Sequence, residues 1–196
     1  KFYRYSSNAN MGAIPQPGPL LPPDGENMFS AVSSNDQIES MVKDIFRSFK
    51  LQLVYRQAER KIEAMRNIND ITYISPYVAL SDTMKRYLFH RIAIESNTGS
   101  TIVFEEPETH TFPYYTKHLA ELIGMDETNQ YFIATHNPYF FKSIVAKTNK
   151  DELMVYIVYM DGFVTQTKLL KQEEVAELLD HDPFSNLDLF FKEVKG

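Results

Sequence analysis

Two acidic residues and a histidine stand directly after short apolar segments of this sequence. Glu105 and Glu106 follow the apolar residues 101–104, and His136 follows the apolar residues 130–135. If both segments are neighbouring strands of a parallel sheet, these side chains lie at its carboxyl edge, where such sheets bind ligands. A carboxylate pair can hold Mg²⁺ and orient a water, and an imidazole can contact a terminal phosphate. The pattern therefore points to phosphoryl-transfer chemistry.

The segments around these residues are predicted to alternate between strand and helix. Residues 101–104 are apolar, β-branched in part and bounded by turn residues, which favours a buried strand. A helix is predicted over 113–125 with Pro113 in its first turn. A strand over 130–135 and a helix over 138–147 follow. This alternation indicates an α/β fold with a parallel sheet flanked by helices.

The rest of the chain predicts further elements around this unit. Residues 1–25 read as an extended, proline-rich connector that ends in a turn. The segment 61–65 suits a strand or a helix equally. Further helices are expected from about Ser34 to Phe46, over 83–96, over 171–179 and in the tail after Pro183, and further strands over 51–55, over 71–74 and as a hairpin over 153–160 and 163–168. We expect three segments: a connector (1–33), a helical and β-hairpin arm (34–80) and a main lobe (81–196).

Composition excludes several classes of site. The chain has 196 residues, a formal net charge of −6 and no cysteine, which rules out disulfides, zinc-thiolate sites and cysteine nucleophiles. Its acidic balance argues against a broad phosphate-binding surface but not against a local basic patch. It contains no apolar run long enough to cross a bilayer, so we expect no membrane insertion. The absence of cysteine fits a reducing, cytoplasmic location.

Three short motifs together resemble a known family. Residues 101–113 (TIVFEEPETHTFP) resemble the Walker B strand of ATP-binding-cassette (ABC) ATPases, in particular the RecF/SMC/OLD-like branch of P-loop NTPases. Residues 131–138 (YFIATHNP) are similar to the H-switch strand of the same family, and 80–86 (LSDTMKR) to its signature motif. The motifs occur in the family's order. Residues 21–28 (LPPDGENM) also resemble a segment that this branch carries between its two lobes.

The resemblance implies a role for each motif residue. Glu105 falls at the Mg²⁺-associated Walker B position, where Asp is usual, and Glu106 at the catalytic carboxylate that activates the attacking water. His136 matches the switch histidine that senses the γ-phosphate. Ser81 and Asp82 lie in the signature motif, which acts on the nucleotide of the opposite subunit; Thr83 stands where the family has Gly. Glu108 and His110 fall where the dimer-contacting D-loop begins.

The family's phosphate-binding loop is absent from the printed sequence. No G-x-x-x-x-G-K-[S/T] occurs, and no Gly precedes a Lys. We therefore expect that this chain, which begins with Lys1 rather than Met, is the carboxyl-terminal lobe of an ATPase head whose amino-terminal lobe carries Walker A. Alone it is expected to be inactive. In the intact parent the resemblance implies a homodimer that hydrolyses Mg-ATP between two heads and acts on DNA or a partner effector protein.

Other interpretations stay open. The departures at Glu105 and Thr83 also suit a catalytically silent interaction module that kept the ATPase fold. Ser81 could serve only as a helix cap. Glu105, Glu106, Glu108 and His110 could form a metal-dependent nuclease site, although adjacent residues of one strand face opposite sides of the sheet.

Overall fold

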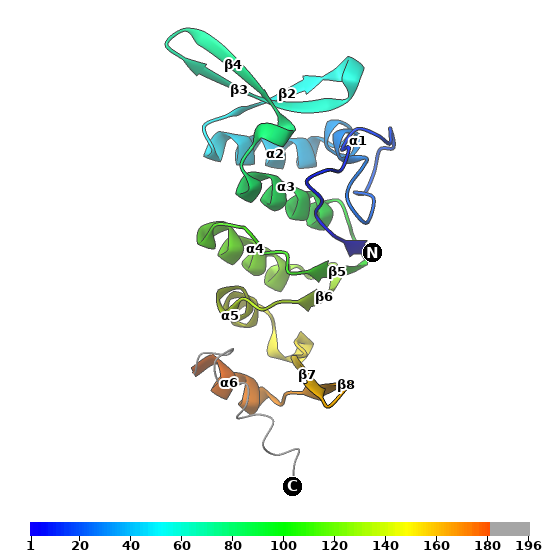
Figure 1. Cartoon of the computed structure of the whole chain (residues 1–196), viewed down its shortest axis with the longest axis vertical. Helices are drawn as coiled ribbons and strands as arrows, with labels where there is room; N and C mark the ends of the chain where they lie inside the picture. Colours follow the sequence, from blue (N-terminus) through cyan, green and yellow to red (C-terminus); the bar gives the residue numbers. More distant parts are fainter. Residues whose placement is uncertain (181–196) are drawn as a thin grey trace.

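The computed structural model describes residues 1–180 as an elongated stack of helices and strands (Figure 1). Helices α2 to α6 lie above one another along one side, and the strands of the central and carboxyl-terminal sheets lie along the other. No helix in this range has the length and apolar character needed to cross a lipid bilayer. The tail helix predicted after Pro183 and the last part of the main lobe lie outside the described residues.

The centre of the molecule is a parallel sheet in the order β1-β5-β6. Strand β1 (Phe2–Tyr3) pairs with β5 (Thr101–Glu105), which pairs with β6 (Gln130–Ala134). Ile102 and Phe104 point into the core and are at most 1% exposed, so the alternating burial of β5 fixes which face of the strand is inside. The prediction of a parallel α/β fold is confirmed.

Three helices pack beside this sheet. Helix α3 (Asp82–Glu95) precedes β5, α4 (Pro113–Met125) follows β5 and α5 (Pro138–Lys147) follows β6. Both α4 and α5 begin with proline, whose missing N–H costs nothing at a first turn. Leu119 and Phe140 are fully buried from these two helices, so each crossover helix covers apolar surface of the lobe.

The residues before α3 form a helical pair and an antiparallel arm. Helices α1 (Met28–Ser33) and α2 (Asp36–Ser48) lie beneath a sheet of order β2-β3-β4, which forms the end of the molecule farthest from α6 (Figure 1). The strands are β2 (Gln52–Arg56), β3 (Lys61–Ile68) and β4 (Ile71–Pro76), with 3₁₀ turns at Gln57–Glu59 and Tyr77–Ala79. Pairing on both sides settles 61–65 as strand rather than helix.

The carboxyl-terminal part forms a hairpin and a helix. Strands β7 (Tyr156–Asp161) and β8 (Val164–Leu169) pair antiparallel around Gly162, whose φ of +62° suits the turn. Helix α6 (Gln172–Asp180) follows, and a 3₁₀ turn at Lys150–Glu152 leads into the hairpin. These elements confirm the predicted hairpin and the predicted helix over 171–179.

The connector expected over 1–33 is more ordered than predicted. It contributes β1 to the central sheet and helix α1 to the core, and Tyr3 and Met28 are at most 1% exposed. The large hydrophobic core also takes residues from the arm and from the main lobe, such as Phe46 and Leu88. The division into segments at 33 and 80 stays a prediction about organisation.

Candidate functional site

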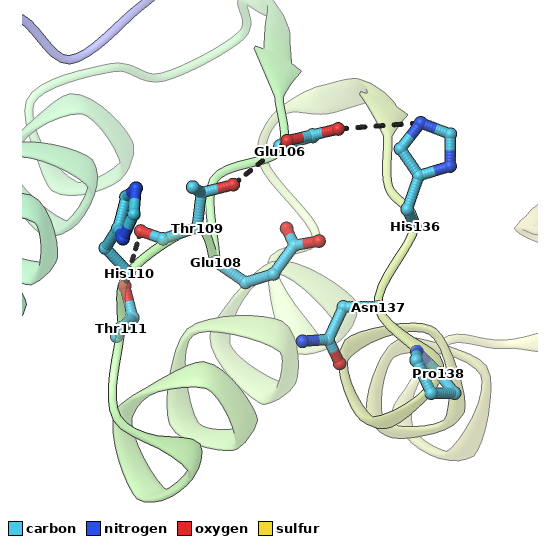
Figure 2. A pocket seen from close by; sticks show the side chains of 8 residues that line it. All are labelled: Glu106, Glu108, Thr109, His110, Thr111, His136, Asn137 and Pro138. Carbon is cyan, nitrogen blue, oxygen red and sulfur yellow. Dashed lines mark hydrogen bonds and ion pairs between the residues drawn. The ribbon is translucent and has the colours of Figure 1, made fainter.

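The ends of β5 and β6 bring Glu106 and His136 together. Glu105 lies opposite Ala134 in the strand register, and the Glu106 N–H donates to the Ala134 carbonyl at 2.8 Å. The Glu106 carboxylate then lies 3.5 Å from Nε2 of His136 (Figure 2). The imidazole is 84% exposed and the carboxylate 43% exposed, so both groups are open to a ligand. Neighbouring parallel strands thus place an acid and an imidazole at one point.

A pocket of about 330 Å³ opens beside this pair. Its residues come from the loop between β5 and α4 and from the turn between β6 and α5. They are Glu106, Glu108, Thr109, His110, Thr111, His136, Asn137 and Pro138. Figure 2 shows the Glu108 side chain between the loop that carries Thr109 and the turn that carries Asn137.

Hydrogen bonds tie the two loops of the pocket to each other. The Thr135 hydroxyl donates to Oε1 of Glu108 and accepts from the Asn137 N–H at 3.0 Å. The Asn137 side chain in turn accepts from the N–H groups of Tyr139 and Phe140, which makes it the N-cap of α5. One chain of polar contacts therefore fixes the start of α5 against the loop after β5.

Glu108 is a buried acid within this network. It is 5% exposed, and its second oxygen, Oε2, is buried without a hydrogen-bond partner in the described part of the chain. Burial raises the pKa of this carboxyl, because the charged form loses solvation, and the Thr135 hydroxyl opposes the shift in part. The nearby Glu106 charge acts in the same direction as burial.

Two pocket residues have left-handed backbone conformations. The φ angles of Glu106 and His110 are +43° and +57°. Such angles are costly for residues with a Cβ, and they concentrate at functional sites when the surrounding structure enforces them. At Glu106 this bend turns the chain out of β5, and the Thr109 N–H and hydroxyl then reach the Glu106 carbonyl and Oε2 at 3.0 and 3.1 Å.

The residues of the signature-like motif start helix α3 beside this loop. Ser81 is the N-cap, and its hydroxyl accepts from the Met84 N–H at 3.3 Å. Asp82 lies 3.0 Å from Lys85, and its hydrogen bond from Lys85 lowers the pKa of the carboxyl. The Thr83 hydroxyl donates to the His110 carbonyl at 3.4 Å. Ser81 therefore caps helix α3. Its proposed contact with the nucleotide of a second subunit stays a prediction.

The remaining candidate residues are placed differently. Glu105 is exposed at the end of β5 and is not among the residues that line the pocket. Within residues 1–180, no cluster of three His, Asp or Glu side chains could hold a metal ion unaided. His110 is exposed, whereas the bond to Thr135 keeps Glu108 inside the lobe, so His110 is better placed than Glu108 for the predicted dimer contact.

Sequence reasoning did not identify the threonines of the site. Thr109 holds Glu106 and Thr135 holds Glu108, yet hydroxyl residues are common in loops and carry no distinctive spacing. The one hint in the sequence was their position, since Thr109 stands three residues after Glu106 and Thr135 directly precedes His136.

The parallel sheet with its crossover helices has the fold of an SMC-type ATPase head, and the acid–imidazole pair lies at the carboxyl edge of that sheet. Residues 19–142 match the sequence family described as "AAA domain, putative AbiEii toxin, Type IV TA system". This match spans more than half of the chain, which therefore belongs to that family and is an ATPase-type domain. No curated protein matches the chain.

Two solved structures of SMC heads share the fold. One, from work on ATP-driven dimerization and DNA-stimulated activation of SMC ATPases, is 17% identical with a TM-score of 0.51; the match covers 79% of this chain and 95% of that one. The other is an SMC head bound to the C-winged helix domain of ScpA, 18% identical with a TM-score of 0.51. There the match covers 77% of this chain but 47% of the SMC head, so this chain spans about half of that structure.

Proposed function

We propose that this chain is the carboxyl-terminal lobe of an ATPase head that binds and hydrolyses Mg-ATP between two heads. The observation that carries the proposal is the meeting of Glu106 and His136, 3.5 Å apart, at the ends of two adjacent parallel strands. Both groups are accessible from the pocket beside them. Membership of an AAA-domain family supports nucleotide as the ligand.

Each residue of the pair has a defined task in this proposal. Glu106 accepts a hydrogen bond from the attacking water and takes its proton as the water adds to the γ-phosphorus and the bond to the ADP oxygen breaks. His136 donates to a γ-phosphate oxygen. The His136 ring is 84% exposed, so it has room to turn from Glu106 toward the phosphate.

The pocket also fits a hard cation in part. Mg²⁺ typically takes one or two carboxylates together with phosphate oxygens and waters. Glu106 and Glu108 offer two carboxylates at the pocket, and Oε2 of Glu108 has no hydrogen-bond partner in the described residues. Bound Mg²⁺ would neutralise charge that develops on the phosphates. The role of Glu105 as a metal residue stays a proposal from its motif position, since Glu105 does not line the pocket.

The second head would supply the signature residues. Ser81 and Asp82 begin helix α3 and are exposed, so they can face a neighbouring subunit. His110, which is exposed beside them, would contribute to the dimer contact with Glu108 behind it. The SMC ATPase of similar fold is described by ATP-driven dimerization and DNA-stimulated activation, which suggests DNA or an effector as the partner that senses the dimer.

A phosphate-binding lobe would complete the site. The printed sequence holds no phosphate-binding loop, so nucleotide binding requires one from elsewhere. In the described residues β6 is one of the two outer strands of the parallel sheet, and Phe132 on it is 57% exposed. An open strand edge with exposed apolar residues is a surface that another strand can cover.

The test is Glu106→Gln in the head that combines this chain with a phosphate-binding loop. Steady-state phosphate release from Mg-ATP should fall about a hundredfold or more, because the variant keeps the shape of the side chain but not its basicity. Glu127→Gln, an exposed acid after α4, is the matched control and should leave turnover unchanged. Unchanged turnover in Glu106→Gln would refute the catalytic assignment.

The rival function is a catalytically silent interaction module. Thr83 at a glycine position of the signature motif favours it, since a side chain hinders close approach of the backbone to phosphate. Calorimetric titration of the same head with Mg-ATP separates the two functions. Saturable binding supports the ATPase, and its absence supports the silent module.

A further inference from the structure

A second pocket lies at the carboxyl end of β1, on the same edge of the parallel sheet as the ends of β5 and β6. It has a volume of about 430 Å³. Its walls are the residues 4–7 that follow β1, Pro23 and Asp24 of the connector, and Arg86 of α3. It shares no lining residue with the Glu106–His136 pocket.

The charges of this pocket are unbalanced. Arg4 and Arg86 both line it, and neither forms an ion pair within residues 1–180. Asp24 is the one acid of the lining. Asp82 acts on Arg86 through space but is itself paired with Lys85 at 3.0 Å. Two arginines therefore line a cavity that has a single acidic residue.

The second arginine is held in place by an aromatic ring. The Arg86 guanidinium carbon lies over the Tyr5 ring, 4.7 Å from its centre, which is a cation–π contact. Nε of Arg86 and the hydroxyl of Tyr5 are buried without hydrogen-bond partners in the described part of the chain. Buried polar atoms normally have hydrogen-bond partners, so these two donors are unsatisfied within the described residues.

The frame of the pocket is also ordered. The Arg4 N–H donates to the Pro23 carbonyl at 2.8 Å, which joins the segment after β1 to the connector. Ser6 and Ser7 add hydroxyl donors on the same wall. Two arginines and two hydroxyls suit a tetrahedral oxyanion, because guanidinium groups bind phosphate oxygens in pairs.

We propose that the pocket formed by Arg4, Ser6, Ser7 and Arg86 binds a phosphate group, either free phosphate or the phosphate of a nucleoside monophosphate. A dianion would offset the charge of the two arginines that line the pocket. The site needs neither the Glu106–His136 pair nor a phosphate-binding loop, so it stands independently of ATP hydrolysis.

The test is an NMR titration of the chain with inorganic phosphate, followed by one with AMP, both without Mg²⁺ and at constant ionic strength set by chloride. Amide signals of residues 4–7 and of Arg86 should shift and saturate. Arg4→Gln removes an exposed guanidinium and should weaken binding about tenfold or more. Arg66→Gln, an exposed arginine of the arm, is the matched control and should bind as the unchanged chain does.

Each outcome decides the proposal. Saturation with phosphate and AMP alike indicates a site for free phosphate, and tighter saturation with AMP indicates a nucleotide-borne phosphate. Shifts that grow linearly without saturation, or an equal loss of binding in Arg4→Gln and Arg66→Gln, would overturn it. Arg4→Gln is chosen over a change at Arg86 because the Arg4 side chain is exposed and its loss leaves the core intact.

Discussion

At the scale of single residues, Glu106 is both the proposed catalytic carboxylate and a residue with a strained backbone conformation. Its φ of +43° lies in the region that favours glycine, and its N–H is held by the Ala134 carbonyl. A residue with a Cβ stays there at a cost of about 1 kcal/mol or more. The Glu106 side chain lines the pocket, so this backbone strain lowers the stability of the fold at the place where the proposed chemistry occurs.

Comparison of two truncations at Glu106 tests this cost. Both Glu106→Gly and Glu106→Ala remove the carboxylate, but only glycine relieves the left-handed backbone. We expect Glu106→Gly to be more stable than Glu106→Ala by about 1 kcal/mol in urea unfolding. Equal stability of the two variants would show that the bend carries no strain.

His90 contributes to how the stability of the fold depends on pH. It is 3% exposed, packs between Phe89 and Phe104, and shares a hydrogen bond with the Arg86 carbonyl at 2.8 Å. Burial lowers the pKa of this imidazole to about 4, because the charged form loses its solvation. The unfolded chain binds a proton near pH 6.5, so the contribution of neutral His90 is complete above that pH and is lost as the pH falls toward 4.

The variant His90→Phe keeps the aromatic packing and removes the titration. Between pH 7 and pH 4 the unchanged chain should lose on the order of 3 kcal/mol more unfolding free energy than His90→Phe does. Urea unfolding at each pH measures it. A difference that stays constant over this range would contradict the assignment of His90 as a buried neutral base.

At the scale of elements, the beginning of α2 depends on one asparagine. The Asn35 side chain accepts from the N–H groups of Gln37 and Ile38 at 3.0 and 3.1 Å. Asn35→Ala should destabilise the chain by about 1 kcal/mol, because two N–H groups lose their acceptor. Asn149→Ala is the control: Asn149 caps only the 3₁₀ turn at Lys150–Glu152, and its loss should cost much less in thermal unfolding. If both variants lowered the thermal stability by similar amounts, the cap of α2 would contribute no more to stability than the cap of the 3₁₀ turn does.

The elements also show what the sequence could predict. Helices α3, α4 and α5 and strands β5 and β6 were predictable because apolar runs of ordinary length are bounded by turn residues, prolines or caps. Strand β1 has two residues and α1 has six, which is too short for a periodic pattern. Their places come from tertiary contacts, through pairing of β1 with β5 and burial of α1 against the core.

The candidate site follows the same division. The approach of Glu106 and His136 follows from two strands that end side by side, which the order of the motifs predicts. The bond between Thr135 and Glu108 depends on the strand register and on the loop after β5, and a shift of one residue would remove it. Side chains at strand ends were therefore predictable, and contacts between loops were not.

At the scale of the whole molecule, the described residues contain two hydrophobic clusters. The large one runs from β1 and the arm to α5. A smaller one, formed by Ile157, Leu170 and Leu178, holds the carboxyl-terminal hairpin and α6, with Phe141 of α5 packed against it. A cluster that buries so little apolar surface supports less local stability than the main core.

The two clusters predict that the carboxyl-terminal hairpin and α6 unfold locally more readily than the central sheet does. In hydrogen exchange followed by mass spectrometry, β7, β8 and α6 should exchange faster than β5, β6 and α4. Ile157→Ala should speed exchange in the hairpin and α6 only, because the cavity lies in the small cluster. Leu119→Ala, at a fully buried position of the main core, should instead speed exchange across the central sheet and its helices. If Ile157→Ala opened β5 and β6 as strongly as Leu119→Ala does, the two clusters would form one cooperative unit.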